Sequence, residues 1–168
     1  TSWAMSLAVA CLSVLRGYAV TFQSISYPYP DGAMNIATAD FLESGCDEML
    51  VIDTDVQFNR EHLEWLLSHD EPLVFGLYPK KQTGLEFPVV PLDANINPFD
   101  GSGPPLREVA RCARGFMRAH RSVFEKMQSH VERYTDAQTG REQSLFWRTL
   151  PGGHSEDFAF CDLWRDRK

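Results

Sequence analysis

Apolar positions along this chain fall into blocks whose spacing predicts alternating helices and strands. Residues 3–15 are almost continuously apolar, and Arg16 and Gly17 follow as a cationic last turn and a glycine stop, so a buried helix is expected there. Residues 18–25 have the character of a strand. Apolar side chains at helical spacing over 34–42 predict a second helix.

The next block, residues 49–52, is a short apolar run without polar alternation, which is typical of a central strand covered on both faces. Asn59 is in position to cap a helix over 60–68, whose leucines form one apolar stripe. Residues 73–78 form the following strand. Strands and helices are therefore expected to alternate through the first half of the chain.

The second half begins with a segment rich in Gly, Pro, Asn and Asp at 80–107, which predicts a loop-rich insertion with a short hairpin near 85–90. Residues 108–117 return to strand character. An amphipathic helix is expected over 121–129 and a final helix over 155–165. This order of elements predicts a three-layer α/β domain.

Composition narrows the class of protein. The 168 residues, 43% hydrophobic and 23% charged, have the make-up of one globular domain. The net charge of −7, without a dominant Lys and Arg cluster, argues against a nucleic-acid partner. The apolar run at 3–15 is too short to span a bilayer, so no integral membrane segment is expected.

Four widely spaced cysteines among apolar neighbours are typical of buried free thiols and favour a cytoplasmic setting: Cys11, Cys46, Cys112 and Cys161.

The triplet Asp53-Thr54-Asp55 directly follows the apolar strand at 49–52. Two aspartates separated by one residue point to opposite faces of a continuing strand, so they can meet one ion only where the strand ends. Ligands bind at such strand ends in open α/β sheets, and carboxylate oxygens suit Mg²⁺ or Mn²⁺. The alternative interpretation is that Asp53 and Asp55 cap a loop or the following helix.

A second candidate cluster, Gly-Gly-His-Ser-Glu-Asp at 152–157, opens the final helix. Either Glu156 or Asp157 is a candidate general base for an acceptor hydroxyl, and the spacing does not decide between them. The structural alternative is that both acids complement the helix dipole, a contribution of about 0.3–1 kcal/mol. His154 is a candidate metal ligand, a group that holds a leaving phosphate, or an ordinary loop histidine.

These segments together resemble the family 2-like glycosyltransferases of the GT-A fold. The resemblance covers nearly the whole chain. It implies one GT-A-like catalytic domain over 1–168, with a Rossmann-like three-layer α/β/α architecture and a mixed, mostly parallel central sheet. The family's first strand is not recognisable before Trp3, so the domain is expected to lack it. The segment 80–107 is interpreted as an insertion or an acceptor-side segment. The residues that carry the resemblance are Asn35, Asp53-Thr54-Asp55, Phe75-Gly76-Leu77-Tyr78, Gly115-Phe116-Met117 and Ser155-Glu156-Asp157.

The resemblance also implies roles for individual residues. Asp53 and Asp55 match the family's metal and donor-diphosphate motif, and the pair Glu156-Asp157 matches its acceptor-side base. Asn35 matches half of an Arg-Asn pair that contacts the donor in some members.

Two further features have a functional and a structural interpretation. Gly115 would let the backbone approach the sugar, although a glycine at a strand bulge explains it equally well. Lys80 and Lys81 are candidate phosphate contacts or solvated surface side chains.

The predicted function is metal-dependent transfer of a sugar from a nucleotide-sugar donor to a hydroxyl acceptor on a glycan, a lipid-linked molecule or a protein. An acidic base without a covalent intermediate favours inversion. A catalytically inactive GT-A-like binding or assembly module is the alternative from another class, supported by the missing first strand. A nucleotidyltransferase also pairs carboxylates around a metal, but it would be expected to show a basic Gly-rich loop near its start.

Overall fold

The computed structural model describes residues 18–93, 106–152 and 154–167. The helix expected over residues 3–15 lies outside them. The described helices are α2 (Pro30–Ser44), α3 (Arg60–Leu67), α4 (Arg121–Met127), the short 3-10 helix η1 (Gln128–His130) and α5 (Glu156–Arg165). The strands are β1 (Glu48–Ile52), β2 (Leu73–Phe75), β3 (Val89–Pro91), β4 (Val109–Cys112), β5 (Phe116–His120), β6 (Arg133–Thr135) and β7 (Glu142–Ser144).

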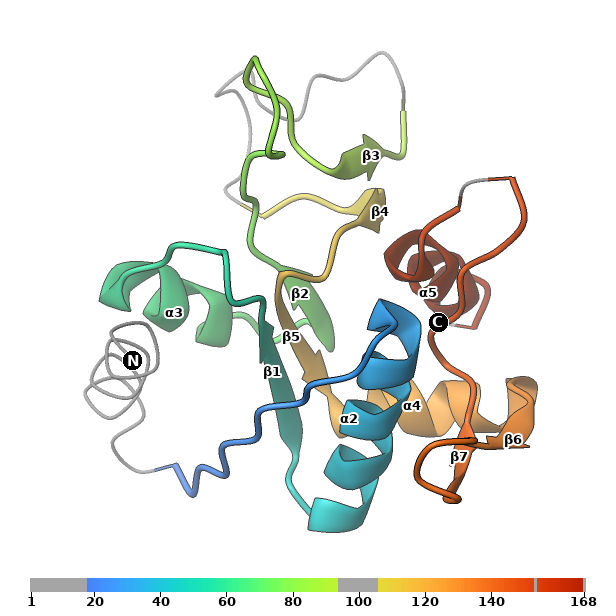
Figure 1. Ribbon diagram of the computed structural model, residues 1–168. Helices are drawn as coiled ribbons and strands as arrows, with labels where there is room; N and C mark the ends of the chain where they lie inside the picture. Colours follow the sequence, from blue (N-terminus) through green and yellow to red (C-terminus); the bar gives the residue numbers. More distant parts are fainter. Residues whose placement is uncertain (1–17, 94–105, 153, 168) are drawn as a thin grey trace.

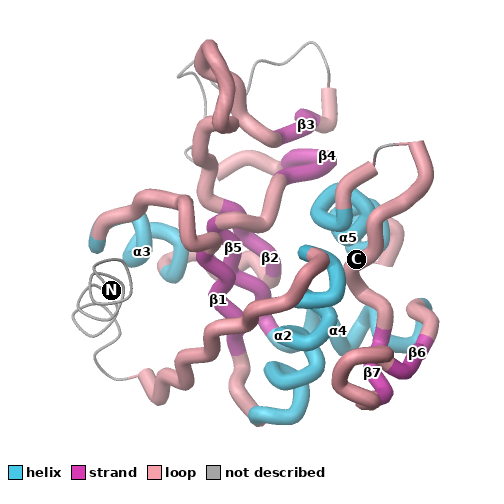
Figure 2. Tube along the Cα trace, in the orientation of Figure 1, coloured by secondary structure: helices cyan, strands magenta, loops and turns pink. Residues whose placement is uncertain are grey.

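The strands form three small sheets, β1-β5-β2, β3-β4 and β6-β7 (Figure 2). Every pairing within these sheets is antiparallel. The prediction of a Rossmann-like α/β/α domain around a mixed, mostly parallel sheet is therefore wrong. The sequence order β1, α3, β2 resembles a parallel unit, but β5 arrives from much later in the chain and takes the place between β1 and β2. Both strands run antiparallel to it.

Alternate side chains of the central sheet face two different apolar clusters. Met49 and Val51 of β1 pack toward the cluster that includes residues of α2, α4 and α5. Leu50 and Ile52 pack toward the cluster that includes Leu66 of α3. In Figure 1, α3 lies on one side of the three strands and α2 and α4 lie on the other. Apolar packing on both faces explains why β1 shows no polar alternation.

Elements with strong local signals lie where the sequence predicted them. The predicted helix at 34–42 is part of α2, which ends at Gly45 with a φ of 75°, a conformation that glycine adopts readily. Asn59 caps α3 by accepting a hydrogen bond from the His62 N–H at 2.8 Å. The predicted strand at 49–52 corresponds to β1.

Other elements differ from the prediction. Residues 18–25 form no strand with the described residues, and the strand expected at 108–117 divides into β4 and β5, which belong to different sheets. The predicted hairpin near 85–90 is replaced by the long-range pairing of β3 with β4. The β6-β7 sheet was not predicted. Within the described residues, every helix is too short or too polar to cross a membrane, and Cys46, Cys112 and Cys161 are free thiols.

Trp147 connects α2 with α5 in the core. Asn35, which is 1% exposed, donates from Nδ2 to the Trp147 carbonyl at 2.8 Å and accepts from the Trp147 N–H at 3.0 Å. The indole Nε1 donates to Thr38 Oγ1 at 2.9 Å, and the indole stacks on the Phe160 ring with centroids 3.8 Å apart. The structure thus places the Asn35 amide in the core, where it is hydrogen-bonded to the protein backbone.

Replacing this amide tests its structural role. Asn35→Ala should lower the free energy of unfolding by about 1–3 kcal/mol, because the buried Trp147 N–H and C=O would both lose their partner. Urea denaturation of the wild type and the variant measures the difference. Unchanged stability together with weakened nucleotide-sugar binding would instead support the donor contact inferred from the sequence.

Candidate functional site

The pairing of β1 with β5 brings the end of one strand beside the start of the other. Ile52 is opposite Phe116, and the Asp53 N–H donates to the Gly115 carbonyl at 2.8 Å. Arg114 precedes that glycine and donates from Nη1 to Asp53 Oδ1 at 2.8 Å. An antiparallel contact between distant segments therefore creates a charged pair at the strand end.

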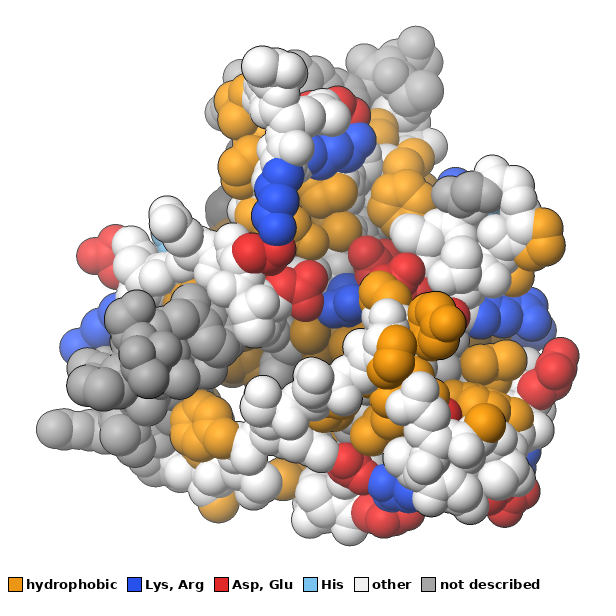
Figure 3. Space-filling model, viewed as in Figure 1, with side chains coloured by type: hydrophobic (Ala, Val, Ile, Leu, Met, Phe, Trp, Pro, Cys, Tyr) orange, Lys and Arg blue, Asp and Glu red, His pale blue; other side chains and the backbone are white. Residues whose placement is uncertain are grey.

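Arg114 also contacts the acids that open α5. Its Nη2 lies 3.5 Å from Glu156 Oε1, and its Nε lies 3.2 Å from Asp157 Oδ1. The last contact lacks hydrogen-bond geometry and is an ion pair only. The Arg114 side chain is 12% exposed, so one largely buried guanidinium holds together a carboxylate that directly follows β1 and the two carboxylates that open α5. Figure 3 shows acidic side chains on both sides of a basic one at the centre of this face.

Asp157 has the most perturbed environment among the predicted site residues. Burial raises its pKa from 3.8 to about 7, and the nearby charges of Glu156 and Asp53 act in the same direction, while the Arg114 guanidinium opposes them. A carboxyl group with a pKa near neutrality can both accept and release a proton at physiological pH. Of the two acids that open α5, Asp157 is therefore the one whose pKa is raised toward neutrality.

Asp55 lies at the same strand end but contacts a different basic side chain. The Asp53 carbonyl accepts from the Val56 N–H at 3.0 Å, so the chain turns directly after β1. The Asp55 side chain is 49% exposed and forms an ion pair with the Lys81 ammonium. The Asp53 side chain is 40% exposed. The two aspartates thus stand on one turn, each paired with a basic side chain.

Gly115 makes room for a neighbouring side chain. A Cβ at this position would lie 2.4 Å from Tyr78 Oη and 3.0 Å from Asp53 Oδ2. The Gly115 N–H donates to Tyr78 Oη at 3.1 Å, and burial raises the Tyr78 pKa to about 12, which keeps the phenol protonated. The close approach of Tyr78 is therefore sufficient to account for a glycine at this position.

The backbone of His154 pairs with that of Leu150. Its carbonyl accepts from the Leu150 N–H at 3.0 Å in an isolated antiparallel bridge.

Across residues 18–93, 106–152 and 154–167, no three His, Cys, Asp or Glu side chains are grouped closely enough to hold a metal ion. Asp53 and Asp55 nevertheless offer the oxygen ligands that suit Mg²⁺ or Mn²⁺. In this structure each of these carboxylates is paired with a basic side chain, Asp53 with Arg114 and Asp55 with Lys81.

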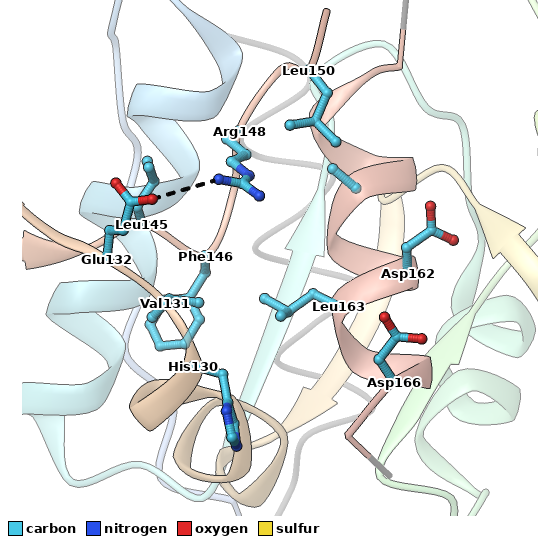
Figure 4. A pocket seen from close by; sticks show the side chains of 11 residues that line it. His130, Val131, Glu132, Leu145, Phe146, Arg148, Leu150, Asp162, Leu163 and Asp166 are labelled. Carbon is cyan, nitrogen blue, oxygen red and sulfur yellow. Dashed lines mark ion pairs between the residues drawn. The ribbon is translucent and has the colours of Figure 1, made fainter.

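A cavity of about 260 Å³ lies away from this cluster (Figure 4). It opens beside α5, but on the face that carries Ala159 and Leu163, whereas Arg114 contacts the first turn of that helix. None of the predicted site residues lines it, so the charged cluster and this cavity are separate features. Its lining consists of His130, Val131, Glu132, Leu145, Phe146, Arg148, Leu150, Ala159, Asp162, Leu163 and Asp166.

The structure therefore brings Asp53, Glu156 and Asp157 together and places Asp55 on the adjacent turn. Sequence reasoning missed Arg114, which joins the three acids. Its only local signal is its position directly before Gly115, and that signal becomes informative once β5 is known to run antiparallel to β1.

Comparisons with known proteins bear on the fold. No protein-family model and no curated protein matches this sequence. Among solved structures, the chain is similar to the protein named "A197 from STIV", with 22% sequence identity and a TM-score of 0.52. The match covers 90% of this chain and 68% of that one. At this identity the similarity concerns the fold, and the function has to be argued from the site.

The raised pKa of Asp157 predicts a specific pH dependence of stability. Between about pH 4 and about pH 7 the folded state binds more protons than the unfolded state, so this group's contribution to stability is present below that window and is lost as the pH rises through it. Asp157→Asn should remove this loss. Urea denaturation across the window should show the variant gaining stability relative to the wild type as the pH rises.

A variant at the other end of α5 provides the control for that measurement. Asp166→Asn removes an exposed carboxyl group from the residue after the helix and should follow the wild-type pH dependence. A constant difference between Asp157→Asn and the wild type across the window would contradict the raised pKa.

Proposed function

We propose that this chain is a metal-dependent glycosyltransferase that moves a sugar from a nucleoside-diphosphate sugar to a hydroxyl acceptor. The observation that carries the proposal is the meeting of Asp53, Glu156 and Asp157 around Arg114, where burial raises the pKa of Asp157 to about 7. Sugar transfer requires a base for the acceptor and positive charge for the diphosphate. The buried Asp157 is suited to act as the base. The exposed Asp53-Asp55 turn is suited to hold a metal ion, which supplies the positive charge.

In the proposed reaction, ionised Asp157 accepts the proton of the acceptor hydroxyl as its oxygen forms a bond to the anomeric carbon. The bond between that carbon and the diphosphate oxygen breaks, and the nucleoside diphosphate leaves with the electron pair. A single displacement of this kind inverts the anomeric configuration. Mn²⁺ or Mg²⁺ held by Asp53 and Asp55 would neutralise charge on the diphosphate.

Arg114 and Glu156 have supporting roles in this proposal. Arg114 contacts Asp53 and Asp157 at once and therefore fixes the distance between the donor-side acid and the base. Glu156 contacts the same guanidinium and restricts its orientation. Its negative charge also raises the Asp157 pKa, which keeps the base close to neutrality.

A binding or assembly module without turnover is the second candidate. The specific observation in its favour is that Arg114 and Lys81 already pair with Asp53 and Asp55, as in a purely structural ion-pair network. Such a module would bind a ligand or partner without releasing nucleoside diphosphate. A measurement of turnover separates the two candidates.

The test is release of nucleoside diphosphate from a panel of UDP-, GDP- and other nucleotide sugars with Mn²⁺ present. Asp157→Asn should lower kcat by about 10²- to 10⁴-fold, because it removes the general base. Asp55→Ala should reduce turnover and weaken its dependence on Mn²⁺. Asp166→Asn, which removes a carboxyl group beyond the far end of α5, is the matched control and should retain activity.

Binding of a nucleotide sugar without turnover by the wild type would favour the non-catalytic module. If the wild type neither binds nor turns over any donor, and Asp55→Ala changes nothing, the proposed function is wrong.

A further inference from the structure

Lys81 lies in the loop between Lys80 and Glu86, and contacts between these two residues hold the loop together. The Lys80 N–H donates to the Glu86 carbonyl at 2.7 Å, and the Lys80 ammonium and the Gln82 amide both contact the Glu86 carboxylate. Lys81 instead extends to Asp55 on the turn after β1. Two adjacent lysines in one loop therefore have different partners, one within the loop and one at the candidate site.

The contact between Lys81 and Asp55 can be exchanged easily. The Lys81 side chain is 76% exposed and that of Asp55 is 49% exposed, and ion pairs exposed to this extent contribute little to stability. A divalent cation on Asp55 would compete directly with the ammonium for the same carboxylate oxygens. Displacement would leave Lys81 on its flexible stem beside the cation, with no change required in the Lys80-Glu86 contacts.

We propose that Lys81 is a diphosphate-binding residue that pairs with Asp55 when the site is empty. The inference rests on the proposed function, because it assumes that a cation and a nucleoside diphosphate bind at the Asp53-Asp55 turn. When they bind, the cation replaces Lys81 on Asp55, and the ammonium pairs with the diphosphate. Asp55 and Lys81 then each keep a partner of opposite charge before and after binding.

The proposal predicts opposite effects on two ligands from one substitution. Lys81→Ala removes the competitor for Asp55, so Mn²⁺ alone should bind up to about fivefold more tightly, as expected for loss of an exposed ion pair. With Mn²⁺ saturating, UDP or GDP should bind several-fold more weakly, because the diphosphate loses a cation. Electron paramagnetic resonance of free Mn²⁺ measures the first affinity, and calorimetry measures the second.

Lys80→Ala is the matched control, because it removes the same charge from the same loop but breaks the contact with Glu86. It should neither tighten the binding of Mn²⁺ nor weaken the binding of UDP or GDP. Lys81→Arg, which keeps the charge, should restore most of the diphosphate affinity.

The outcomes separate this inference from the proposed function. If the wild type binds Mn²⁺ and releases nucleoside diphosphate from a donor, but Lys81→Ala behaves like Lys80→Ala, Lys81 is a surface ion pair only and this inference alone is overturned. If the wild type binds neither Mn²⁺ nor any nucleoside diphosphate, both the inference and the proposed function are overturned.

Discussion

The antiparallel pairing of β1 with β5 is the constraint on which the rest of the structure depends. It places β5 between β1 and β2, and the alternating side chains of these strands then divide between two apolar clusters. The same register sets Arg114 beside Asp53. A slip of one residue would turn the side chains of β5 to the opposite faces, and both the core and the charged cluster would be lost.

The charged cluster contains more acid than base, and burial opposes ionisation of Asp157. With Asp157 protonated, the guanidinium of Arg114 faces the two carboxylates of Asp53 and Glu156; with Asp157 ionised, it faces three. Asp157 relieves this excess by retaining its proton up to about pH 7. One buried arginine thus holds the three acids together while the pKa of Asp157 stays raised to about 7.

The parts of this structure that the sequence predicted depend on local signals. The Asn59 cap and the apolar spacing of α2 lie within single elements and could be recognised there. The sheet direction depends on which distant strand joins β1, and no local pattern contains that information. The same limit applies to the site: the acids were recognisable as motifs, whereas Arg114 acquires its role through long-range pairing. An amide such as that of Asn35 can serve a ligand or a backbone, and packing decides which.

The stacking of Trp147 on Phe160 has a consequence for observing the molecule in solution. The indole is fully buried and joins α2 to the helix whose first turn carries Glu156 and Asp157. If α5 separates from the core, water reaches this indole and its emission shifts to longer wavelength, even while the central sheet remains intact. In a variant that keeps Trp147 but replaces the other three tryptophans, this indole is therefore an optical probe of whether the helix bearing the acids is docked.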